Sequence, residues 1–157
     1  MAYNSEFMKE AIRIAVENVK NGTGGPFGAV VVRDGEIIAT SGNTVVPDND
    51  PTAHAEVNVI RKACKHLDSF QLKGCEIYSS CEPCPMCLGA IYWARPERVY
   101  YACTKDDAAA GGFDDSYIYK EIALDGPLRF IPFENKREEG AGEEFALWQI
   151  TKNKVKY

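Results

Sequence analysis

The spacing of apolar residues predicts that helices and short strands alternate along the chain. At the start, apolar residues recur at helical spacing behind Asn4 or Ser5, either of which can cap a helix that ends at Asn21-Gly22. Two short apolar runs, 29–32 and 36–39, then flank Asp34-Gly35. That dipeptide is typical of a tight turn, so these runs are predicted to form a β-hairpin.

Three more strands are expected, at 75–79, 98–102 and 128–132. Helices are predicted from a cap at Thr52 to about residue 67, from Pro83 or Pro85 to Arg95, over 113–123, and from 143 to about 152. Loops are predicted at 46–51 and 106–112, and a glycine-broken linker at 138–144. This order indicates an α/β fold: a three-layer α/β/α sandwich whose mixed sheet has about five strands.

Composition and charge narrow the class of protein. A length of 157 residues suits one domain, 1–157, and a net charge of −5 argues against nucleic acid as the main partner. No apolar run approaches the ~20 residues of a membrane helix, and the N-terminus has no signal-peptide core. We therefore expect a cytoplasmic protein without a membrane partner, in which the six cysteines stay reduced.

Three of these cysteines, Cys81, Cys84 and Cys87, fall within seven residues and are interleaved with prolines. Such a segment is compatible with a metal site, a redox dithiol or an iron–sulfur cluster. A cluster would need a fourth thiolate from elsewhere in the chain, from Cys64, Cys75 or Cys103. A dithiol needs no histidine and leaves the motif at His54 unexplained.

That motif is His54-Ala55-Glu56, at the predicted start of a helix. Cys84 and Cys87 lie three residues apart at the start of another helix, so their sulfurs share a face. One imidazole and two thiolates match a catalytic zinc site whose fourth position is left for water. The order H-x-E…P-C-x-x-C is also the signature of zinc nucleobase deaminases, in which the glutamate is a general acid and base. We therefore predict one Zn²⁺ bound by His54, Cys84 and Cys87, with Glu56 catalytic and Cys81 a structural neighbour.

Segments 24–30, 49–56 and 78–96, with 112–115, 118–122 and a terminal tyrosine, resemble the bacterial guanine deaminases of the cytidine-deaminase-like fold. The resemblance covers nearly the whole chain. It implies zinc-dependent hydrolysis of guanine to xanthine and ammonia. Purine tRNA deaminases resemble the core motif too, but a more basic surface is expected of them.

The resemblance also implies roles for further residues. Asn43 would hydrogen-bond the purine edge, and the backbone of Ala55 would fix the reacting side together with Glu56. The two aromatic walls of the ring would be Phe27 and Trp93. Asp115 would contact the substrate's amino group and help ammonia to leave, although Asp114 and Asp115 are also suited to capping a helix.

The same resemblance implies a homodimer in which the C-terminal segment, about 138–157, is swapped onto a partner subunit. Tyr157 would then close the partner's active site. Other interpretations stay open: the same chemistry on guanosine, an aminotriazine, adenine or cytosine, or a non-catalytic zinc-binding module in which Glu56 is merely an acid at a helix start.

Overall fold

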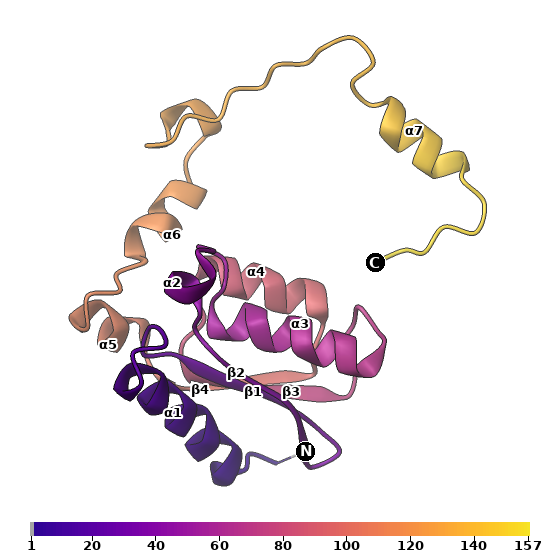
Figure 1. The fold of residues 1–157 in the computed structure, drawn as a ribbon. Coiled ribbons are helices and arrows are strands. Elements are labelled where there is room, and N and C mark those ends of the chain that lie inside the picture. The colour runs from indigo at the N-terminus through magenta and orange to yellow at the C-terminus, as the bar shows by residue number, and fades with distance from the viewer. Residues whose placement is uncertain (1) are drawn as a thin grey trace. The chain divides into compact units, whose positions relative to one another are not determined.

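A computed structural model describes residues 2–157 and divides the chain into two units, one extending to Asp115 and the other spanning Ser116–Tyr157. In the first unit a four-stranded sheet has the order β2-β1-β3-β4 (Figure 1). Its strands are β1 (Gly28–Arg33), β2 (Glu36–Gly42), β3 (Cys75–Cys81) and β4 (Arg98–Cys103). β1 is antiparallel to both of its neighbours, whereas β3 and β4 run parallel, so the sheet is mixed as predicted.

Helices cover both faces of this sheet. α1 (Ser5–Lys20) lies on one face, and α3 (Ala55–Leu67) and α4 (Pro85–Ala94) lie side by side on the other (Figure 1). Alternate residues of β1 face the two layers: Ala29 and Val31 pack with α3 and α4, while Val30 and Val32 pack with α1. All four side chains are fully buried, as the period of two in a strand requires. The three-layer α/β/α prediction is confirmed.

Two predicted loops contain short helices. α2 (Val45–Asp48) lies in the expected 46–51 loop, and α5 (Lys105–Ala110) lies in the expected 106–112 loop. α5 begins with a capping box: Thr104 accepts from the backbone N–H of Asp107, and the Asp107 carboxylate accepts from the backbone N–H of Thr104. This reciprocal pair satisfies two backbone donors and stabilises the helix start.

The second unit contains α6 (Ser116–Ile122), a 3₁₀ turn η1 (Gly126–Leu128) and α7 (Glu143–Ile150). The fifth strand, predicted at 128–132, is wrong. The carbonyl of Gly126 accepts from the backbone N–H groups of both Arg129 and Phe133, and the Phe130 N–H donates to Glu121. These bonds fold the segment back toward α6, so its backbone is not paired in a ladder.

No residue of the second unit is buried, although it is rich in large apolar side chains. On α7, Phe145, Leu147 and Ile150 are 68, 60 and 78% exposed. A helix with apolar residues exposed in this way is typical of one that packs against another surface. Within residues 2–157, no helix is long and apolar enough to cross a membrane.

Candidate metal centre and active site

The starts of α3 and α4 carry the candidate metal ligands. His54 is the N-cap residue of α3, and Cys84 is the N-cap residue of α4, followed by Pro85 at the first helical position. The prediction that Thr52 caps this helix is wrong, because Thr52 bonds through both its backbone N–H and its hydroxyl to Asp50. Neither the His54 nor the Cys84 side chain makes a capping hydrogen bond, so each is available as a ligand.

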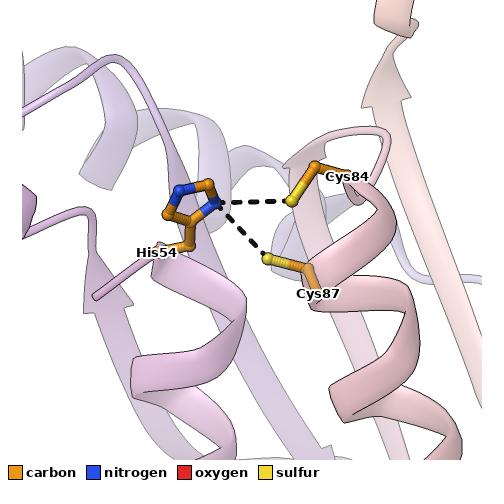
Figure 2. A group of neighbouring side chains, drawn as sticks. All are labelled: His54, Cys84 and Cys87. Carbon is orange, nitrogen blue, oxygen red and sulfur yellow. Dashed lines mark hydrogen bonds between the residues drawn. The ribbon is translucent and has the colours of Figure 1, made fainter. Parts of the chain in front are cut away.

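The three predicted ligands converge on one point. Nδ1 of His54 lies 3.6 Å from Sγ of Cys84 and 3.5 Å from Sγ of Cys87 (Figure 2). Zn–S bonds of ~2.3 Å and Zn–N bonds of ~2.0–2.1 Å at a tetrahedral angle place N and S about 3.6 Å apart. His54, Cys84 and Cys87 are also the one group of three metal-binding side chains within reach of one another among residues 2–157. The donor set fits zinc.

The electrostatics of the group favour a charged thiolate beside an imidazole. The pKa of Cys84 is lowered, first by its interaction with the neighbouring Cys87 side chain and then by its hydrogen bond with His54. The pKa of His54 is raised, first by its hydrogen bond to Cys84. The pKa of Cys87 is raised by the same interaction and by burial, so the pair favours the negative charge on Cys84. A bound metal would displace the thiol proton of Cys87, because thiolate is the ligand form.

Glu56 lies beside this group but offers a different function. It follows His54 by two residues, is only 4% exposed, and has an oxygen 3.5 Å from Sγ of Cys87. Its other oxygen accepts a hydrogen bond of 3.2 Å from the Ser79 hydroxyl. Burial raises the pKa of Glu56, which suits a carboxyl group that gains and loses protons during a reaction.

Two predicted substrate contacts lie in loops tied to the start of α3. Asn43 is 6% exposed, and its backbone N–H donates to the Phe27 carbonyl. The next residue, Thr44, donates its N–H to Ala53, which directly precedes His54. Phe27 packs edge to face against Phe113 at 5.0 Å. Ala55 is fully buried as the first residue of α3.

The remaining predicted contacts differ in placement. Asp115 is close enough to the site for the charge of Cys84 to raise its pKa, in addition to the larger effect of burial. Trp93 is 65% exposed near the end of α4, and the six residues that separate it from Cys87 correspond to ~9 Å along the helix axis. Tyr157 is 71% exposed in the second unit. The roles of Asp115, Trp93 and Tyr157 stay predictions.

The contact between Ser79 and Glu56 was not predicted. Ser79 belongs to the strand that runs into the cysteine segment, and nothing in its own residue type points to a site. The one feature that could have predicted this contact is the position of Ser79 on the central strand β3, on the face that packs beneath the start of α3. The Cys81 side chain bonds to the Thr104 carbonyl and is not part of the metal group, in agreement with its predicted structural role.

Comparison with known proteins identifies the family. Residues 1–103 match the family model described as the cytidine and deoxycytidylate deaminase zinc-binding region, and this match contains all the candidate ligands. The chain belongs to this family. The matched region spans the complete sheet, α3 and α4, and therefore the whole candidate metal centre.

Individual relatives extend the likeness beyond that region. Guanine deaminase from Bacillus subtilis is 56% identical over 96% of this chain and 97% of its own length. An X-ray structure of guanine deaminase from Bacillus subtilis superposes with a TM-score of 0.97 at 54% identity, covering 99% of both chains. A tRNA-specific adenosine deaminase from Agrobacterium fabrum is 45% identical over 64% of this chain and 66% of its own length.

Proposed function

We propose that this protein is a zinc-dependent guanine deaminase, which hydrolyses guanine to xanthine and ammonia. The main support for hydrolytic deamination is that the Glu56 carboxyl is buried beside the three metal-binding side chains His54, Cys84 and Cys87. The likeness to guanine deaminase covers 96% of the chain, including the second unit. The likeness to the tRNA deaminase covers only 64%. The full-length likeness therefore favours guanine over an adenosine in tRNA.

The reaction needs a nucleophile and a group that moves protons. Zinc bound by His54, Cys84 and Cys87 would lower the pKa of a water molecule from 15.7 to about 7. Glu56 would accept a proton from the water whose oxygen adds to the ring carbon that carries the amino group, and would deliver this proton to a ring nitrogen. It would then take the remaining proton of the added hydroxyl and pass it to the amino group, so that the C–N bond breaks, ammonia leaves and the hydroxyl oxygen becomes the carbonyl oxygen of xanthine. Glu56 serves as base and acid in turn.

Side chains around the metal group would hold the base in place. Asn43 would bond to the purine edge, and the Ala55 backbone would fix the reacting side beside Glu56. Phe27 is already held by Phe113, so its ring is a fixed surface on which a planar base can stack. Trp93 would form a second wall, and Asp115 would contact the departing amino group.

The second unit is proposed to complete the site of a partner subunit in a homodimer. None of its side chains is buried, most of its large apolar side chains are exposed, and the segment 129–142 that joins η1 to α7 contains no helix or strand. Transfer of about 138–157 to a second copy would bury α7 and bring Tyr157 to the partner's pocket. A closed pocket would exclude the ribose of guanosine. The cytoplasmic location expected from the sequence stays a proposal.

A substrate panel tests this proposal. Purified zinc-loaded protein is incubated with guanine, guanosine, adenine and cytosine, and ammonia is measured for each. Guanine should be the preferred substrate and should give xanthine in equal amount to ammonia. Faster turnover of guanosine would contradict the closed pocket. Turnover of adenine or cytosine alone would contradict the substrate assignment but leave the reaction class standing.

A further inference from the structure

Ser79 reaches the catalytic carboxyl from beneath the active site. Its hydroxyl donates to Oε1 of Glu56 at 3.2 Å, and both residues are buried, at 2 and 4% exposure. Among residues 2–157, the other side chain that hydrogen-bonds this carboxyl is Cys87, whose thiol donates to Oε2. In the metal-bound form Cys87 is a thiolate and has no proton to donate. Ser79 is then the side-chain donor that Glu56 retains.

Ser79 is held in place more firmly than a loop residue would be. It lies on β3, which pairs with strands on both sides: its Cα partners are Ala29 of β1 and Tyr101 of β4. A donor on a strand fixed from two directions has little freedom to follow a moving carboxylate. The orientation of Glu56 is therefore tied to the sheet, in addition to the turn of α3 on which it lies.

We infer that Ser79 is a positioning residue, whose hydroxyl orients the Glu56 carboxylate so that one oxygen stays directed at the reacting atoms. This inference rests on the proposed deaminase function. A carboxylate that transfers protons more than once must keep its reach and angle throughout, and a displacement of ~1 Å at a reacting group can lower the rate about 100-fold. Loss of the hydroxyl should therefore reduce kcat, with little effect on how the base binds.

The test compares Ser79→Ala with Ser79→Thr and with a matched control, Ser41→Ala. Ser41 is also a buried serine of the same sheet, 6% exposed, but its hydroxyl bonds to Gly42 and Lys62 and touches neither Glu56 nor a candidate ligand. Each variant is assayed for kcat and KM with guanine, for zinc per chain and for its melting temperature. The crystal structure of zinc-loaded Ser79→Ala reports on the Glu56 carboxyl directly.

Ser79→Ala should lower kcat by about 10- to 100-fold, change KM by less than about twofold and retain its zinc. Its Glu56 carboxyl should be rotated or occupy more than one conformer. Ser79→Thr, which keeps the hydroxyl, should recover part of kcat, and Ser41→Ala should behave as wild type. The inference is overturned if kcat of Ser79→Ala equals that of Ser41→Ala, if kcat falls only in step with zinc content, or if folded, zinc-loaded Ser79→Thr is no better than Ser79→Ala. Absence of ammonia release from guanine by the wild type would instead overturn the proposed function, and this inference with it.

Discussion

The contact between α1 and the first residue of β1 allows a sharp prediction about stability. At Gly28, an added Cβ would overlap the Ala11 carbonyl oxygen and lie 2.7 Å from the Ala15 backbone nitrogen. Both atoms belong to the backbone of α1, so no side chain can rotate away and the helix itself must shift. Overpacking of this kind costs ~1–3 kcal/mol, and the backbone clash places Gly28→Ala at the upper end, about 3 kcal/mol.

Gly89→Ala is the matched control for this substitution. Gly89 is an exposed residue inside α4, and an added Cβ there would meet nothing within 4 Å. Because glycine in a helix interior is less stable than alanine, Gly89→Ala should increase stability by ~0.5–1 kcal/mol. The same chemical change is thus expected to have opposite signs at the two positions.

Urea unfolding of zinc-loaded protein at one fixed protein concentration measures both effects. With a urea dependence of ~2 kcal/mol per molar, the midpoint of Gly28→Ala should fall by about 1.5 M, and that of Gly89→Ala should rise by about 0.3–0.5 M. A Gly28→Ala midpoint within about 0.3 M of wild type would refute the close packing of α1 on β1. Phe27 directly precedes Gly28, so the same result would also contradict the view that packing of β1 on α1 supports the loop that carries Phe27.

Three further predictions concern the metal group, the chain end and a buried thiol. Cys87→Ser should lower the bound zinc, measured by atomic absorption, well below one per chain. Cys64→Ser changes a cysteine outside the metal group and should retain one zinc per chain. Equal zinc content in the two variants would contradict the ligand assignment. Deletion of 152–157 should abolish guanine turnover while zinc stays bound, and unchanged activity would refute the Tyr157 lid. Burial raises the pKa of Cys81 to about 11, so at pH 8 its thiolate fraction is about 100-fold below that of a thiol with a pKa of 9. Mass spectrometry after brief iodoacetamide treatment should find Cys81 unlabelled in folded protein and labelled in urea; rapid labelling of the folded form would contradict its burial.

The layers of the fold and the metal group could be predicted because local signals agree with tertiary structure there. Asn4 caps α1 as expected, and Asp34-Gly35 forms the turn between β1 and β2. The spacing of Cys84 and Cys87 at a helix start brings both sulfurs to one face regardless of how the rest of the chain folds. The position of His54 beside the two cysteines, in contrast, depends on tertiary structure, because the sheet must bring the starts of α3 and α4 together.

Two secondary-structure predictions are wrong, at 128–132 and at 106–112. The apolar run at 128–132 has the composition of a strand, but a strand is stable only when its backbone groups pair with another strand. In this segment the backbone N–H groups donate instead to the Gly126 carbonyl and the Glu121 carboxylate. At 106–112 the reverse error occurred: small residues suggested a loop, although the capping pair Thr104 and Asp107 was present in the sequence.

Substrate choice could not be derived from local patterns at all. Asn43 and Asp115 are separated by about seventy residues, and the substrate contacts proposed for them depend on where a base would bind. The second unit adds a further difficulty. Residues 116–157 contain no buried side chain, so their apolar pattern does not indicate which surface they pack against. For these residues the resemblance to a family supplied what periodicity and spacing did not.

The central claim is that Glu56, beside a zinc held by His54, Cys84 and Cys87, performs the proton transfers of guanine deamination. It is tested most directly by the kcat for ammonia release from guanine, measured for wild type and Glu56→Gln at equal zinc content. The predicted result is an active wild type that forms one xanthine per ammonia, and a Glu56→Gln variant that is fully zinc-loaded but slower by at least about 100-fold. A zinc-loaded wild type that releases no ammonia, or a Glu56→Gln variant with the wild-type kcat, would contradict the claim.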